Sequence, residues 1–211
     1  MRGSHFFPVL LLGLCSAATA EIAVYRDAPN SYVAANIMMT TVEGGQVDQS
    51  QGGFSFRLGG MIDENFGAEV RLGRGLWHET QRLPGDVRLQ IDVDHVAGLY
   101  GTARLPFNVP LIDVPLVDKL FVHALAGVAD IQLRAQQDIC VGGCRGTTVT
   151  RESALDFSWG LGVGAELKLP KIELPVMNMP RRVGLSLEYM DYSGFDDVDV
   201  SGIEAGVMVF F

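Results

Sequence analysis

The stretch "LDFSWGLGVGAELKL", residues 155–169, alternates without interruption between two kinds of side chain. Its odd positions carry Leu, Phe, Trp, Leu, Val, Ala, Leu and Leu, and its even positions carry Asp, Ser, Gly, Gly, Gly, Glu and Lys. Successive side chains of a β-strand point to opposite faces. The stretch therefore predicts a strand with one wholly apolar face and one face that is polar or very small.

The same period of two recurs along the chain, separated by breaks rich in Gly, Pro and Asp, and helical periodicity is scarce. This pattern predicts an all-β protein. Eight strands are expected: 32–41, 53–60, 66–73, one beginning at Val87, 120–134, 155–169, 185–190 and 200–211.

Eight alternating strands suit a soluble barrel or sandwich, with the apolar face inside, or a transmembrane barrel, with the apolar face in lipid. The polar face favours the membrane barrel, because it combines glycine with charges of both signs that can pair across a narrow lumen. Aromatic girdles at the lipid interfaces are expected from Phe54, Phe56, Phe66, Phe157, Trp159 and Tyr189. The predicted lumen charge network is Arg57, Glu69, Arg71, Asp92, Arg104, Asp130, Glu166, Lys168, Glu188 and Glu204.

The first twenty residues have the features of a secretory signal. Arg2 precedes an apolar stretch too short to span a bilayer, and Ala18-Thr19-Ala20 provides a cleavage pattern of small residues. We predict a cleaved signal peptide over residues 1–20 and a barrel domain over residues 21–211. A signal anchor is the alternative for the apolar stretch. Lipidation at Cys15 is disfavoured because Leu14, and not a small residue, precedes it.

The end of the chain, "GIEAGVMVFF" at residues 202–211, has an apolar face that finishes on an aromatic residue. It resembles the C-terminal assembly signal of Gram-negative outer-membrane β-barrels. The signal residues would be Ile203, Ala205, Val207, Val209 and Phe211.

The stretches "SYVAANIMM", "GAEVRLG", "HALAGVADIQ", "FSWGLGVGAEL" and "LSLEYMDY" are similar to the OmpA-like family of eight-stranded outer-membrane β-barrels. The resemblance implies an antiparallel up-and-down transmembrane β-barrel in the cell outer membrane. It also implies outer-membrane lipid, lipopolysaccharide and the barrel assembly machinery as partners. Many OmpA-like proteins carry a peptidoglycan-binding domain after the barrel; none is expected here, since the chain stops at its last strand.

An even number of strands puts both ends of the barrel domain on the same side of the membrane, and the secretory signal indicates that this side is the periplasm. Segments 42–52, 74–86, 135–153 and 193–199 are then expected to face outward. The longest of them contains Cys140 and Cys144 in the sequence "CVGGC". Export favours a disulfide between them. A zinc site would need further Cys or His ligands, and none lies nearby in the sequence.

A net charge of −9 and a pI near 4.8 argue against a nucleic-acid partner, because no basic stripe is available to neutralise phosphates. We expect a structural or surface-interaction role through the outer loops, and an unidentified extracellular ligand is a possible partner of these loops. Asp196, Asp197 and Asp199 suggest a divalent-cation site, although a solvated acidic loop is the simpler interpretation. The alternative function is a narrow porin-like channel, if the glycines of residues 155–169 leave room for water.

An enzyme is not expected, and neither a cofactor nor a metal ion is implied. The histidines after the signal are His78, His95 and His123, and no nucleophile and acid recur beside them in a catalytic motif. His95 and His123 are expected on the apolar face of their strands.

Overall fold

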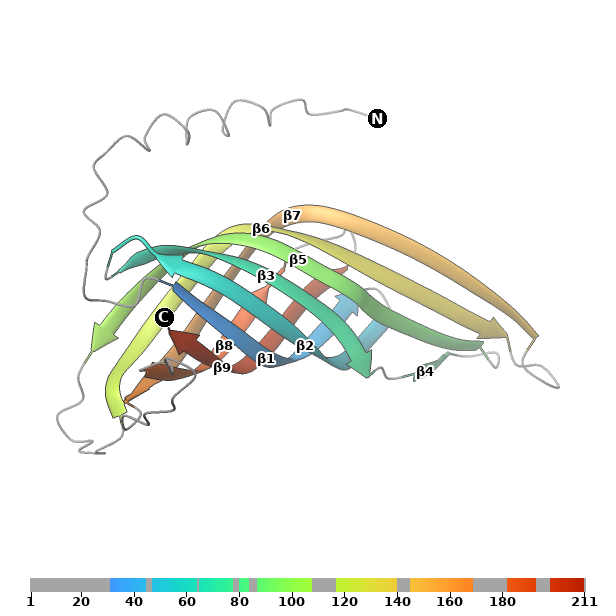
Figure 1. Ribbon diagram of the computed structural model, residues 1–211. Coiled ribbons are helices and arrows are strands. Elements are labelled where there is room, and N and C mark those ends of the chain that lie inside the picture. Colours follow the sequence, from blue (N-terminus) through green and yellow to red (C-terminus); the bar gives the residue numbers. More distant parts are fainter. Residues whose placement is uncertain are drawn as a thin grey trace, which may run out of the picture.

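The computed structural model describes residues 31–44, 47–63, 65–77, 80–83, 87–107, 117–139, 145–168, 182–192 and 198–210. They form nine β-strands (Figure 1): β1 (Ser31–Gly44), β2 (Val47–Met61), β3 (Phe66–Trp77), β4 (Thr80–Leu83), β5 (Val87–Phe107), β6 (Val117–Ile139), β7 (Arg145–Lys168), β8 (Arg182–Asp191) and β9 (Asp199–Phe210). Within these ranges no helix is long and apolar enough to cross a membrane.

Eight of the strands close into an antiparallel barrel. The hydrogen-bonded order is β3-β2-β1-β9-β8-β7-β6-β5-β4, and an additional β3–β5 pairing completes the ring, so that only the short β4 is appended to it. The pairing of Tyr32 with Phe210 brings the start of β1 beside the end of β9 (Figure 1). We call this end of the barrel the terminal rim and the opposite end the far rim. The predicted eight-stranded barrel is confirmed.

The strands are longer than the sequence pattern suggests, and most of the segments expected as outer loops are strand. Residues 42–44 and 47–52 continue β1 and β2, and residues 135–139 and 145–153 continue β6 and β7. Figure 1 shows β5, β6 and β7 running on beyond the ends of β1, β8 and β9. In these extensions apolar and polar residues alternate less clearly in sequence.

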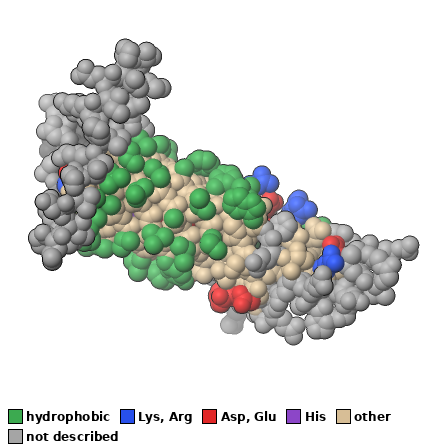
Figure 2. Space-filling model, turned by 90° about the horizontal axis from the view of Figure 1, so that it is seen from below, with side chains coloured by type: hydrophobic (Ala, Val, Ile, Leu, Met, Phe, Trp, Pro, Cys, Tyr) green, Lys and Arg blue, Asp and Glu red, His purple; other side chains and the backbone are tan. Residues whose placement is uncertain are grey.

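Large apolar side chains cover the outside of the barrel near the terminal rim. Figure 2 shows them gathered over part of the wall, with charged side chains toward the other end. Of the predicted girdle residues, Phe56, Phe66, Phe157 and Tyr189 are exposed in this layer. We call this layer the apolar belt; it consists of Val33, Ile37, Met39, Phe56, Leu58, Phe66, Val70, Leu72, Leu99, Leu105, Val122, Val128, Phe157, Leu161, Val163, Leu185, Leu187, Tyr189, Ile203 and Val207.

The signal peptide (residues 1–20), Phe211, Cys140 and Cys144 lie outside the described residues. Cleavage after Ala20 and the Cys140–Cys144 disulfide therefore stay predictions. His78 and the acidic pair Asp196 and Asp197 also lie outside the described residues.

Candidate functional site

Five of the predicted lumen residues meet in the middle of the barrel interior. We call them the interior charge network: Arg57, Glu69, Arg71, Glu188 and Glu204. Each is at most 3% exposed. Arg71 pairs through Nε with Glu69 and through Nη2 with Glu188, and its Nη1 lies 3.5 Å from Glu204 Oε2. Arg57 pairs with Glu188 as well. Arg71 is thus the one cation of the network that contacts all three carboxylates.

Neutral side chains also form hydrogen bonds with the carboxylates and with Arg57 of the network. Ser55 donates to Glu204 at 2.8 Å and Tyr192 donates to its other oxygen at 2.7 Å. Arg57 donates from Nη2 to Asn36 at 2.9 Å and to Ser186 at 2.7 Å. Buried charges are tolerated in proteins when they are both paired and hydrogen-bonded. The network meets both conditions.

Apolar side chains close the interior on both sides of the network. Toward the terminal rim lies the lower apolar cluster of Tyr32, Ala34, Phe121, Met208 and Phe210. Toward the far rim lies the upper apolar cluster, formed by Val42, Val93, Val96, Tyr100, Leu125, Ala129, Ile131, Leu133, Met190, Tyr192 and Val200. The interior is therefore layered, with the interior charge network between two clusters of apolar side chains.

The narrow channel, the alternative function, depends on the glycines of β7 leaving room for water, and the space beside Gly162 and Gly164 is filled. A Cβ atom at Gly162 would lie 2.6 Å from His123 Cε1, and a Cβ at Gly164 would collide with the ring of Phe121. The space beside these glycines is occupied by inward side chains of β6. Eight-stranded barrels are just wide enough to be filled in this way.

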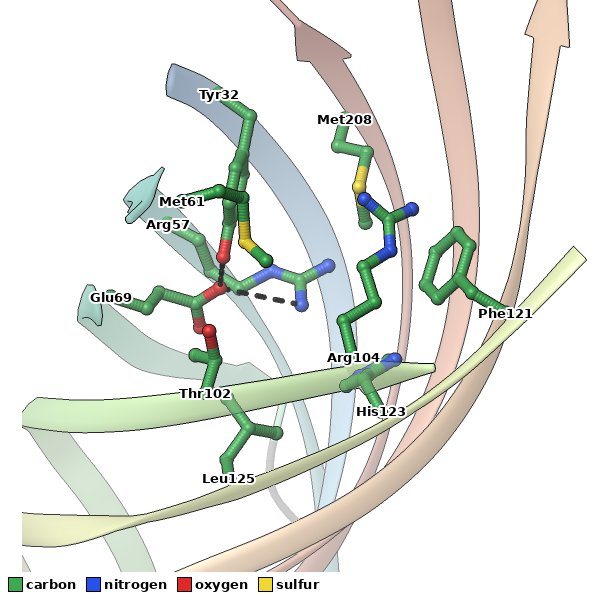
Figure 3. A pocket seen from close by; sticks show the side chains of 10 residues that line it. All are labelled: Tyr32, Arg57, Met61, Glu69, Thr102, Arg104, Phe121, His123, Leu125 and Met208. Carbon is green, nitrogen blue, oxygen red and sulfur yellow. Dashed lines mark hydrogen bonds and ion pairs between the residues drawn. The ribbon is translucent and has the colours of Figure 1, made fainter. Parts of the chain in front are cut away.

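A small cavity remains between the network and the lower apolar cluster (Figure 3). Figure 3 shows Tyr32 and Glu69 on one side of it, and Arg104 with Phe121 on the other. Its volume is ≈ 30 Å³, which is room for about one or two water molecules. A cavity of this volume is too small to hold a solute larger than water.

Arg104 and Glu166 also lie inside the barrel, but apart from the network. They pair at 2.9 Å near the terminal rim, where Arg182 lies 3.5 Å from the second Glu166 oxygen. The Arg104 guanidinium stacks over the Phe121 ring, 3.5 Å from its centroid. The Lys168 side chain lies outside what the structure describes.

Asp92 does not lie in the lumen, and the reason is a β-bulge. The register of β5 against β6 shifts between Val93 and His95. A bulge adds one residue to a strand and so exchanges its two faces. Beyond it, Val93 and Ile91 point inward and pack in the upper apolar cluster. Asp92 therefore points outward, beside its cross-strand neighbour Arg134.

Asp130 is also on the outer surface, because β6 has the opposite phase from the one expected. Its odd residues Phe121, Leu125 and Ile131 are buried inside. Asp130 consequently points outward, 43% exposed, with its carboxylate 3.3 Å from His95 Nε2.

The same phase of β6 brings His123 into the interior, where its Nε2 lies 3.1 Å from Glu188, and not onto the apolar outer face where it was expected. His95 does lie on the outside.

The sequence interpretation missed the neutral members of the interior. Asn36, Ser55 and Ser186 all point inward. Ser55 lies two positions before Arg57 and Ser186 two positions before Glu188, so a search for polar residues at that spacing from a predicted lumen charge would have found both serines. Tyr32 and Tyr192 carry no such signal. Both sit at strand ends, where a tyrosine is equally typical of a membrane interface.

At the far rim, part of the wall stands free of the ring. β3 pairs with β5 from Phe66 only as far as Gly73, opposite Val96. β8 ends at Asp191, opposite Trp159 of β7. Beyond these points, residues 87–95, 131–139 and 145–154 of β5, β6 and β7 continue as a sheet, to which the short β4 adds a strand opposite residues 87–90; we call it the protruding sheet.

Two glutamines of β2 cover the open edge of β5 where β3 has ended. The Ile91 N–H donates to the Gln49 carbonyl oxygen at 3.0 Å, and the Gln49 amide donates to the Leu89 carbonyl at 3.1 Å. The Val93 N–H donates to Gln51 at 2.9 Å. These side-chain amides take the place of the hydrogen bonds that a neighbouring strand would make. They avoid the cost of leaving a buried backbone group without a partner, which is about 1–3 kcal/mol.

The comparisons with known proteins agree with this architecture. A family model described as "outer membrane protein beta-barrel domain" matches residues 7–211. Ail, the attachment invasion locus protein of Yersinia pestis in complex with the heparin analogue sucrose octasulfate, has a TM-score of 0.51 at 10% identity, covering 86% of this chain and 98% of Ail. This likeness supports the fold.

Two further solved structures share the barrel more loosely. Neisserial surface protein A has a TM-score of 0.43 at 16% identity, over 86% of this chain and 97% of its own. The N-terminal β-barrel domain of Pseudomonas aeruginosa OprF has a TM-score of 0.41 at 13% identity, over 87% of this chain and 99% of its own. No curated protein sequence is similar enough to the chain to count as a relative.

Proposed function

Because the chain belongs to the outer membrane protein β-barrel domain family, we propose that it is an outer-membrane barrel with a closed lumen that acts through its far rim. The observation that carries the proposal is the layered interior. A solute would have to cross the lower apolar cluster, the interior charge network and the upper apolar cluster in turn. The outer face is left as the part of the molecule that can meet a partner.

The orientation supports the same function. The even number of barrel strands puts the start of β1 and the end of β9 at the same rim, and a cleaved signal over residues 1–20 would deliver the chain to the periplasm. Assembly through the apolar face of β9, which includes Ile203 and Val207, would leave the terminal rim in the periplasm. The apolar belt then contacts outer-membrane lipid and lipopolysaccharide, and the protruding sheet extends outside the cell.

The charges of the far rim favour a different kind of partner from the heparin analogue that was crystallised with Ail. Glu43 of β1 lies directly opposite Asp48 of β2 and Asp199 of β9, and all three are exposed. Like charges facing one another across strands repel. This row favours a neutral or cationic partner, whereas Ail was crystallised with a heparin analogue.

Planar-bilayer recording tests the closed lumen. Refolded protein whose insertion has been checked by heat-modifiable gel migration should show no current steps above the leak. A general porin added to the same bilayer serves as the positive control. Unitary steps that require the folded barrel would contradict the closed lumen and favour the narrow channel.

Cysteine labelling on intact cells tests the orientation. In a C140S/C144S background, R151C on the exposed part of β7 should react with a membrane-impermeant maleimide. I62C is the matched control, because Ile62 is 60% exposed in the turn between β2 and β3 at the terminal rim. It should react only after lysis. Labelling of I62C but not R151C on intact cells would reverse the orientation.

A further inference from the structure

A pocket opens in the outer wall where β3 and β5 separate. We call it the rim pocket; its polar and aromatic lining is Gln51, Arg74, Trp77, Asp92, Asp94 and Arg134. Its volume is ≈ 120 Å³, well below the roughly 300–1,000 Å³ of sites for drug-sized ligands. The rim pocket is therefore large enough for a single small polar ring and too small for a longer ligand to be enclosed.

The lining includes buried donors whose hydrogen-bonding capacity is not used. Gln51 is 5% exposed, and its carbonyl oxygen is held by the Val93 N–H. Its amide nitrogen is buried and has no hydrogen-bond partner in the part of the chain that the structure describes, and the same is true of Arg134 Nε. An unmet buried donor is costly. Acceptors from a ligand would remove that cost.

The charges of the rim pocket balance. Two guanidinium groups, Arg74 and Arg134, stand with two carboxylates, Asp92 and Asp94. Arg74 Nη2 lies 3.7 Å from Asp94 Oδ1. A net charge of zero gives no preference for an isolated phosphate over a cation. It does place donors and acceptors side by side, which suits a neutral ligand that carries both.

We propose that the rim pocket binds one pyranose unit of a saccharide. Each sugar hydroxyl donates one hydrogen bond and accepts others. The carboxylates can accept from the hydroxyls, while Arg134 and the Gln51 amide donate to them. Trp77, which is 63% exposed at the edge of the pocket, offers the negatively polarised face of its indole to the C–H groups of the ring.

The depth of the rim pocket indicates where such a sugar would come from. Along β3, the lining residue Arg74 is the next outward-facing residue after Leu72 of the apolar belt. The pocket thus begins where the belt ends, at the level of the headgroups. The source of the sugar, though not its binding, rests on the orientation proposed above: the headgroup or core sugars of a glycolipid in the same leaflet, or a glycan on another surface.

Trp77 makes a direct test possible. The chain has two tryptophans, so W159F leaves Trp77 as the sole indole. The protein is kept in an amine-oxide detergent, because glucoside and maltoside detergents would compete. The probes are core oligosaccharide released from lipopolysaccharide, glycans released from a secreted glycoprotein, and inorganic phosphate. A saturable change of Trp77 emission is expected with at least one of the saccharides and not with phosphate.

Two substitutions in the W159F background locate the binding. R134Q removes one guanidinium, and Q51E keeps an oxygen for the Val93 N–H while removing the unused donor. Each should weaken binding at least about tenfold. R88Q is the matched control, since Arg88 is an exposed arginine on β5, the strand that pairs with the β6 of Arg134, and is not part of the lining. It should leave the affinity unchanged. Every variant is first checked for heat-modifiable migration.

The outcomes separate the alternatives. A response to core oligosaccharide alone assigns the sugar to the glycolipid of the same membrane, and a response to the released glycans assigns it to another surface. No saturable response to any saccharide, an equal response to phosphate, or equal affinities for R134Q, Q51E and R88Q would overturn the proposal. Bilayer recording and R151C labelling involve no sugar, so a failure here leaves the proposed function to be judged by those two experiments.

Discussion

Arg71→Met is expected to lower the free energy of unfolding by at least about 3–5 kcal/mol, the cost of removing one partner from a buried ion pair. Arg71 contacts Glu69, Glu188 and Glu204. Without it, three buried carboxylates share Arg57 as the remaining arginine of the network. The measurement is a urea titration of the reconstituted barrel, followed by heat-modifiable migration.

Charge balance predicts a rescue of this variant. The network holds two arginines and three glutamates, and R71M/E188Q restores the same excess of one carboxylate. The double variant should recover at least half of the lost stability. Arg74→Met, on the same strand but 65% exposed, is the matched control and should stay within about 0.5 kcal/mol of the wild type. Equal losses for R71M and R74M would contradict the structural role of the network.

Gly162→Ala is expected to destabilise the barrel by about 1–3 kcal/mol through overpacking. The new methyl group would lie 2.5 Å from Glu188 Cγ and 2.6 Å from His123 Cε1. It would therefore displace a carboxylate that holds both arginines of the network. The same urea titration measures the effect, and the His123 contact makes the loss larger than a methyl group alone suggests.

Gly101→Ala is the matched control for this substitution. Gly101 lies on the exposed face of β5, and the nearest heavy atom to its added Cβ would be 3.7 Å away. Alanine is less costly than glycine in a strand interior, so G101A should be neutral or slightly stabilising. If G162A and G101A change the free energy of unfolding by the same amount, the prediction that the lumen side of β7 is tightly packed is wrong.

Much of the barrel was predictable because lipid imposes a simple rule on the sequence. Wherever a strand crosses the apolar belt, one face must be apolar, and residues 155–169 follow this rule without exception. The interior cluster of Arg57, Glu69, Arg71, Glu188 and Glu204 followed from the same alternation. It succeeded there because the outward neighbours of these residues, such as Phe56 and Leu187, are large and apolar.

The prediction failed where both faces of a strand are apolar or where neither face is in lipid. In β6, Phe121 and Leu125 alternate with Val122 and Ala124, so composition does not distinguish the two faces. The larger side chains turned inward to fill the lumen beside the glycines of β7. The β-bulge between Val93 and His95 puts Asp92 on the outside, and the inward phase of the odd residues of β6 does the same for Asp130.

The sequence by itself determined the eight strands that close the barrel and, for most of them, which face is apolar, because each of these features depends on the residues of one strand; the short β4 and the phase of β6 were not determined in this way. Only the tertiary structure decided which side chains meet across the barrel. Arg71 and Glu188, or Gln51 and Val93, come from different strands, and closure of the ring sets their separation. The closed interior and the rim pocket are therefore properties of the assembled wall, which no single strand encodes.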